Sequence, residues 1–186
     1  MDTTTLVILL VIVILIAWMV TLYNRLVSLK ANRENAFSDI DVQLKLRFDL
    51  VPNIVNTVKW YAKHEKEVLN QVMEARTGFM NAKTIDGKVA ANNELNGALK
   101  TLFAVAEAYP ELKANQNFLR LQEDLSDVEN KLAAARRYFN SATKEYNIAV
   151  QTFPSVLIAK TFWFPTYEYF ELDEPEAKKA PKVEFD

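Results

Sequence analysis

The stretch FLRLQEDLSDVENKLAAARRYFNSATKEYNIA, residues 118–149, decides the fold. Its apolar positions alternate steps of three and four residues without a fault. These seam positions are Phe118, Leu121, Leu125, Val128, Leu132, Ala135, Phe139, Ala142, Tyr146 and Ala149. A sustained 3.5-residue rhythm is typical of helices that pack in a bundle or coiled coil. It predicts a helix over residues 115–150, about 54 Å long at roughly 1.5 Å per residue, and hence an elongated bundle.

The chain before this helix shows a similar rhythm. Apolar residues recur at three and four residues from Phe37 to Phe79, which predicts one long helical arm. Pro52 lies inside this arm, lacks an N–H and crowds the preceding turn, so we expect a kink or a break near Leu50. The residues that follow, 84–87, read as a turn because they contain Asp and Gly. A shorter helix over 89–108 is then predicted to end before Tyr109 and Pro110.

The composition favours an all-α protein. Only three glycines and six prolines occur in 186 residues, which suits long helices better than turn-rich sheets. The formal net charge of -2 lacks the basic excess that captures phosphates, so we expect no nucleic acid partner. Cysteine is absent, which excludes disulfides, thiolate metal sites and a cysteine nucleophile.

The N-terminus has the character of a transmembrane anchor, which we assign to residues 1–23. Residues 3–23 carry no charge, and about 21 helical residues at roughly 1.5 Å each span a hydrocarbon layer of ~30 Å. Tyr23 suits the headgroup level, whereas Trp18 suits either the headgroup level or burial in the lipid. The anchor residues predicted to face lipid are Leu6, Val7, Ile8, Leu9, Leu10, Val11, Ile12, Val13, Ile14, Leu15 and Ile16.

Two flanking features indicate how this anchor is used. A cleaved signal peptide needs a basic start and a small-x-small cleavage site, and neither is present, so we expect the helix to be retained. Arg25, Lys30 and Arg33 follow the helix, whereas only the α-amine and Asp2 precede it. The positive-inside rule then predicts a short N-terminus outside and a cytoplasmic body, 24–170.

The C-terminal part changes character at residue 153. Residues 153–170 are rich in aromatic side chains, which either pack across the end of the bundle or lie in the membrane interface. We favour packing, because aromatic residues dominate cores more often than they mark membrane contacts. The tail, 171–186, has mixed charge and little to bury, so we expect it to be disordered.

No motif supplies the groups of a catalytic or metal site. His64 is the one histidine, whereas a zincin motif needs two and a di-iron bundle needs one on each of two helices. Phosphate-binding glycine loops and nucleophile elbows are missing as well. We therefore predict no enzymatic activity, no catalytic residue, no metal site and no cofactor.

A group of acidic residues near the start of the body could suggest acid–base chemistry. Asp39 and Asp41 are about 200° apart on a helix, so they cannot face one substrate together with Asp49. Lys45 and Arg47 lie within pairing distance along the helix surface. We expect an ion-paired, solvated face here.

Several motifs spread over nearly the whole chain resemble the LemA family. They include YNRLV (23–27), DIDVQLKLRFDLVPNIV (39–55), YAKHE (61–65), YPELKA (109–114), RYFN (137–140) and YFE (169–171). The resemblance implies a bacterial, membrane-anchored, four-helix up-and-down bundle without an established enzymatic activity. Four helices imply either a break near Pro52 or a short extra helix after Pro154. The family often has Gly where Trp163 stands, so we expect a different local backbone there, since Trp disfavours conformations typical of Gly.

The expected role is that of a scaffold in the bacterial inner membrane. Its partners are the lipid bilayer and further copies of itself, and it organises membrane or partner proteins. Four apolar residues, Val42, Leu46, Val55 and Val105, either form subunit contacts or fill the bundle's own apolar stripe. The alternative is an adaptor or regulator of a membrane protein, such as a membrane protease, with the aromatic C-terminal segment as its contact.

Overall fold

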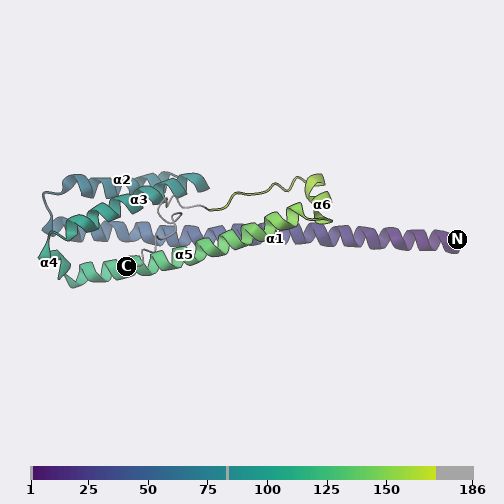
Figure 1. Cartoon of the computed structure of the whole chain (residues 1–186), viewed down its shortest axis with the longest axis horizontal. Coiled ribbons are helices and arrows are strands. Elements are labelled where there is room, and N and C mark those ends of the chain that lie inside the picture. Colours follow the sequence, from purple (N-terminus) through teal and green to yellow (C-terminus); the bar gives the residue numbers. More distant parts are fainter. Residues whose placement is uncertain (1, 83, 171–186) are drawn as a thin grey trace, which may run out of the picture. The chain divides into compact units, whose positions relative to one another are not determined.

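The structure, a computed structural model, describes residues 2–82 and 84–170. Within these residues the chain forms six helices and no strand, which confirms the all-α prediction (Figure 1). The helices are α1 (Thr3–Tyr61), α2 (Lys66–Asn81), α3 (Ile85–Ala106), α4 (Pro110–Lys113), α5 (Gln116–Gln151) and α6 (Ser155–Thr161). The predicted tail, 171–186, lies outside the described residues.

The described chain divides into two compact units. Unit 1 contains residues 2–42 and 132–170, and unit 2 contains residues 43–82 and 84–131. The helices α1 and α5 each contribute residues to both units, because they are the two longest.

Unit 2 is a four-helix up-and-down bundle, as the family resemblance implied. The end of α1, then α2, α3 and the start of α5 are its four long helices, and the short helix α4 connects α3 to α5. The Phe48 and Phe79 rings stack between α1 and α2 with centroids 3.9 Å apart. On α3 and α5, Phe103 meets Phe118 edge to face. The Tyr61 hydroxyl accepts from Asn115 Nδ2, which ties the end of α1 to the start of α5.

The break between the first two helices of unit 2 lies at residues 62–65. A break near Leu50 is therefore wrong, and so is a single arm that reaches Phe79. The helix α1 passes through Pro52 and ends at Tyr61, and the Glu65 N–H then donates to the Ala62 carbonyl in a turn. The sequence carries a signal at this position, because Glu65 interrupts the apolar stripe between Tyr61 and Val68, but the stripe resumes at Val68 and therefore predicts a continuous arm.

A side chain of α2 replaces the hydrogen bond that Pro52 removes. In a helix the missing N–H of residue 52 leaves the carbonyl of residue 48 without its backbone donor. The Arg76 Nε donates to the Phe48 carbonyl oxygen at 3.2 Å. Helices tolerate an internal proline where another group satisfies the freed carbonyl, which explains why α1 continues here.

The start of α3 corrects the turn predicted at residues 84–87. Thr84 is the N-cap, and its hydroxyl oxygen accepts from the Gly87 N–H at 3.1 Å. A threonine oxygen at this position satisfies one of the free N–H groups of the first turn, so the helix begins at Ile85 instead of at residue 89. The helix predicted over residues 115–150 is found as α5, with Asn115 Oδ1 accepting from the Phe118 N–H.

In unit 1, residues 26–37 of α1 pack antiparallel to the last part of α5. Phe37 contacts Phe139 edge to face, and the Arg33 Nε donates to the Thr143 hydroxyl at 3.2 Å. The short helix α6 follows Pro154, as one of the two alternatives implied, and adds to the same core. This core consists of Leu26, Tyr146, Ala149, Val150, Ile158 and Ala159.

The helix α6 ends in a motif that usually contains glycine. The Phe164 N–H donates to the Ala159 carbonyl at 2.9 Å, which is the closing bond of a Schellman motif. Trp163 occupies the left-handed position of this motif with φ of 56°. The expectation that Trp163 changes the backbone is therefore wrong, because the tryptophan takes the conformation that favours glycine.

Replacing Arg76 with alanine should lower the free energy of unfolding by about 1 kcal/mol, because the Phe48 carbonyl loses its donor. In the Pro52→Ala background the same change should cost much less, since the alanine N–H reaches that carbonyl. Denaturant unfolding of the four proteins in detergent gives the coupling energy. An equal loss in both backgrounds excludes this role for Arg76. The exposed Arg120, replaced by alanine, is the control.

Candidate functional site

The segment after α6 is held on unit 1 by two asparagines of α5. Asn147 donates from Nδ2 to the Tyr167 carbonyl at 2.8 Å and accepts the Tyr167 N–H at 2.9 Å. Asn140 makes the same pair with Phe170, at 3.0 and 2.8 Å. Each asparagine side chain therefore donates to the carbonyl and accepts from the N–H of the same residue, as the backbone of a neighbouring β-strand would. We call residues 164–170 the strap.

The spacing of these residues makes both pairs possible at once. Asn140 and Asn147 are seven residues apart, or about 10.5 Å along a helix. Tyr167 and Phe170 are three residues apart, or about 10 Å along an extended chain. The two repeats match, so the strap runs extended along α5.

Arg33 of α1 adds a third contact to the strap. Its guanidinium lies 4.0 Å from the centroid of the Tyr167 ring and 4.8 Å from that of Phe139. Such cation–π contacts strengthen when the cation is shielded from water, and Arg33 is buried. Burial lowers the pKa of Arg33, while the nearby Tyr167 opposes that effect.

Tyr146 fastens the start of the strap. Its hydroxyl donates to the Pro165 carbonyl at 2.9 Å, and its side chain is fully buried. Burial raises the pKa of Tyr146 to about 12, so the hydroxyl remains protonated and keeps donating at neutral pH. The strap is thus anchored at two levels of α5, by Asn140 at one and by Tyr146 and Asn147 at the other.

The aromatic segment is divided between packing and exposure. Phe170 is buried, and Phe164 and Tyr167 pack against the core of unit 1. By contrast, Phe153, Phe162 and Trp163 are exposed. The packing that we favoured therefore holds for the strap, which lies along α5, and for Ile158 and Ala159 of α6, but not for these exposed side chains.

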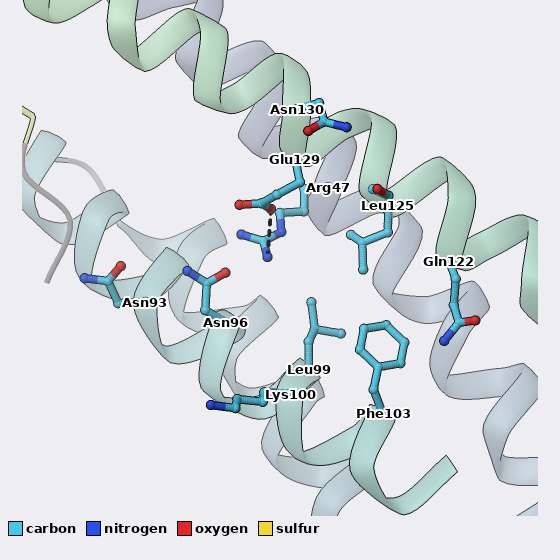
Figure 2. A pocket seen from close by; sticks show the side chains of 11 residues that line it. Arg47, Asn93, Asn96, Leu99, Lys100, Phe103, Gln122, Leu125, Glu129 and Asn130 are labelled. Atoms are coloured by element: carbon cyan, nitrogen blue, oxygen red, sulfur yellow. Dashed lines mark ion pairs between the residues drawn. The ribbon is translucent and has the colours of Figure 1, made fainter. Parts of the chain in front are cut away.

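Unit 2 contains a groove of about 670 Å³ between α3 and α5. Leu99 and Phe103 of α3 face Leu125 of α5 across it (Figure 2). Polar side chains surround these apolar ones, namely Arg47, Asn93, Asn96, Lys100, Gln122, Ser126, Glu129 and Asn130. The groove could receive an extended or helical segment with both apolar and polar contacts.

Arg47 at the edge of this groove corrects the surface ion pairing predicted for it. It is only 5% exposed, its Nη1 donates to Asn92 Oδ1 at 2.6 Å, and its Nη2 lies 3.1 Å from Glu129 Oε2 (Figure 2). A buried cation needs such partners, because desolvation is expensive. Arg47 therefore joins α1, α3 and α5 inside unit 2.

The predicted anchor residues are exposed in the structure, whereas the predicted seam residues are buried or half-buried. In α1 every anchor residue from Leu6 to Ile16, with Trp18 and Tyr23, is exposed, and none of the most apolar stretch is buried. This helix is long and apolar enough to cross a membrane. In α5 the seam residues Phe118, Leu125, Val128, Leu132, Phe139 and Tyr146 are buried, and Leu121 is half-buried.

The residues weighed for chemistry do not come together. His64 is exposed in the turn after α1, and Asp39 and Asp49 are exposed on α1. Among the described side chains, no group of three or more His, Cys, Asp or Glu could hold a metal ion. What the structure brings together instead is a set of hydrogen-bonding side chains that hold helices and strap in place.

The sequence analysis missed the two asparagines of α5, although a signal was available. Asn140 and Asn147 each follow a seam residue and are seven residues apart, so they recur with the heptad. A polar residue repeated beside an apolar seam indicates a structured polar contact. For Arg47 and Asn92, which come from different helices, no comparable spacing exists.

Replacing Asn147 with alanine should lower the free energy of unfolding by about 2 kcal/mol, because both backbone groups of Tyr167 lose their partner. The exposed Asn130 of the same helix is the matched control, and its alanine variant should change stability by less than about 0.5 kcal/mol. Denaturant titration followed by circular dichroism measures both. Similar losses for the two variants would argue against the strap contacts.

Replacing Asn92 with alanine should cost about 2 kcal/mol, because the buried Arg47 guanidinium loses an acceptor. Replacing Glu129 with alanine should cost less, about 1 kcal/mol or below, since its side chain is 40% exposed and water can replace it. Thermal and denaturant unfolding give both values. The reverse order would contradict the role assigned to Asn92.

Comparison with known proteins places this fold in a family. A family model described as LemA matches residues 36–185. Among similar proteins, the magnetosome protein MamQ of Magnetospirillum gryphiswaldense is 24% identical over 185 residues, covering 84% of this chain and 68% of that protein. Protein LemA of Metamycoplasma hominis is 25% identical over 157 residues, covering 82% of this chain and 70% of that protein. Neither name is that of an enzyme. With the motif at 39–55 and the helical body, the match shows that this chain belongs to the LemA family.

Proposed function

We propose that the chain is a non-enzymatic scaffold tethered to the bacterial inner membrane by α1. The observation that carries the proposal is the uninterrupted 59-residue helix α1, which contains both the exposed apolar stretch and part of the folded body. The apolar stretch of α1 has no buried side chain, so it has no place in a soluble core, whereas lipid solvates it favourably.

The charges beside the apolar stretch support a cytoplasmic body. Arg25 is exposed directly after it, and Lys30 follows a little more than one turn later. Arg33, the third positive charge after the anchor, is buried against aromatic rings and stays on the same side of the membrane as the body. The positive-inside rule then places the N-terminus outside.

Self-association is the second part of the proposal. Val42 and Leu46 lie one turn apart on α1 and are 54% and 47% exposed. Val55 is buried and Val105 is half-buried, so these two fill the bundle's own stripe instead of forming subunit contacts. Exposed apolar side chains that lie together on one helix face can be buried against the same face of a second copy, as in a two-fold symmetric dimer.

An adaptor function is the second candidate, and the groove of unit 2 favours it. Its apolar floor and polar rim suit a segment of a partner, for example a membrane protein such as a membrane protease. The strap is already bound by Asn140 and Asn147, so the groove is a better candidate contact than the strap. Lys100→Glu at the exposed rim of the groove should abolish partner capture and leave self-association unchanged.

The absence of cysteine permits a direct test with Leu46→Cys in the full-length chain. In isolated membranes a short bismaleimide should link two copies through this residue, because it lies in the proposed contact. The matched variant Ala104→Cys, exposed on α3, should remain monomeric. In intact spheroplasts both thiols should resist a membrane-impermeant maleimide and react after lysis.

Each outcome of this experiment has a separate meaning. Absence of Leu46→Cys dimers in the membrane contradicts the proposed contact. Labelling in intact spheroplasts contradicts the cytoplasmic orientation. Recovery of the intact chain in the soluble fraction contradicts the tether itself.

A further inference from the structure

The end of unit 1 near the apolar stretch carries large side chains that the fold leaves exposed. Phe153 is 79% exposed, Leu157 58%, Phe162 52% and Trp163 90%. All of them come from α6 and its two flanking turns. The opposite side of α6 is occupied, because Ile158 and Ala159 are buried in the core of unit 1. One side of this short segment is therefore packed, and the other is apolar and unpacked.

Contacts inside unit 1 fix this segment at the level where the apolar stretch of α1 ends. The ring centroid of Tyr23 lies 5.0 Å from that of Phe162 and 5.7 Å from that of Phe164. Leu22 packs against the core cluster that contains Ile158 and Ala159. The uncharged stretch of α1 ends at Tyr23, and the first charge is Arg25. Exposed aromatic rings thus lie beside the residue where α1 leaves the hydrocarbon.

The chemistry of the segment matches a membrane interface. Trp and Phe rings are favoured at headgroup level, where one edge is apolar and the other is wet. Lys160 of α6 is an exposed cation next to these rings, and Arg25 is exposed after the apolar stretch. Lysine and arginine side chains reach phosphates from this depth.

The backbone conformation of Trp163 also favours a contact with a membrane. Tryptophan rarely adopts a positive φ, yet residue 163 takes φ of 56° with its side chain 90% exposed. The side chain gains little contact within the described chain that could offset this conformation. A contact of the exposed ring with a surface outside the chain would offset it.

From these observations we propose that residues 153–163 form a second membrane contact, which inserts Phe153, Leu157, Phe162 and Trp163 into the headgroup layer of the bilayer that α1 spans. This inference rests on the proposed tether. The contact fixes the body against the membrane surface at a second point, beside the helix that crosses it. A single helix leaves the body free to tilt, whereas two contacts restrict its orientation.

The chain contains three tryptophans, which allows each level to be probed separately in the full-length protein. Three variants each keep one tryptophan and carry phenylalanine at the other two positions. They report on Trp18 in the apolar stretch, Trp163 in the proposed contact and Trp60, which is 78% exposed in unit 2. All three are reconstituted in phosphatidylcholine–phosphatidylglycerol vesicles that carry spin labels either near the headgroup or deep in the acyl chain.

We expect Trp163 to be quenched several-fold more by the shallow label than by the deep one. It should also emit at shorter wavelength than Trp60 and resist aqueous iodide. Trp60 should show the opposite behaviour, and Trp18 should be the most sensitive to the deep label.

Two results would overturn the interfacial contact while leaving the tether intact. Trp163 could be quenched by iodide as strongly as Trp60, which means that the segment faces water. It could instead be shielded from both iodide and lipid labels, which means that protein covers it. If Trp18 is also insensitive to the lipid labels, the tether fails and the interfacial contact fails with it.

Discussion

A proline inside a helix leaves one carbonyl without a backbone donor. The continuity of α1 depends on a side chain that replaces this donor. The Arg76 side chain donates to the Phe48 carbonyl, so the helix continues through Pro52 to Tyr61. Because α1 continues, its apolar N-terminal stretch and its folded residues belong to one element. The break that a four-helix bundle needs then falls at residues 62–65, where Glu65 closes a turn on Ala62.

The same principle, that a side chain completes the hydrogen bonding of the backbone, organises unit 1. Among the described residues no strand pairs with the strap, so its backbone amides need other partners. Asn140 and Asn147 supply them. Arg33 contacts the Tyr167 ring, and the Tyr146 hydroxyl donates to the Pro165 carbonyl. By fixing the strap, these residues also fix the turn before it, which contains Trp163. The polar contacts between α5 and the strap thus hold the exposed aromatic residues beside the end of the apolar stretch of α1.

Much of the architecture follows from local patterns. The seam of α5 predicted a helix that the structure places at Gln116–Gln151, because an apolar rhythm reports the face that a helix buries. The break that was one of the two alternatives predicted at Pro52 does not occur, because the compensating donor, Arg76, comes from another helix and cannot be recognised in a local pattern. The turn predicted at residues 84–87 failed for a different reason: Thr84, Asp and Gly suit both a turn and a helix N-terminus, and only the hydrogen bond from the Gly87 N–H to Thr84 distinguishes them.

The sequence by itself determined the all-α class, the apolar N-terminal helix and the family, because periodicity, hydrophobicity and local motifs are properties of neighbouring residues. The tertiary structure decided which polar residues matter. Arg47 became a buried link to Asn92 and Glu129, and Arg33 became a cation between two rings. These roles depend on residues brought together from helices far apart in the chain, and desolvation, which makes each contact necessary, arises only when the chain has folded.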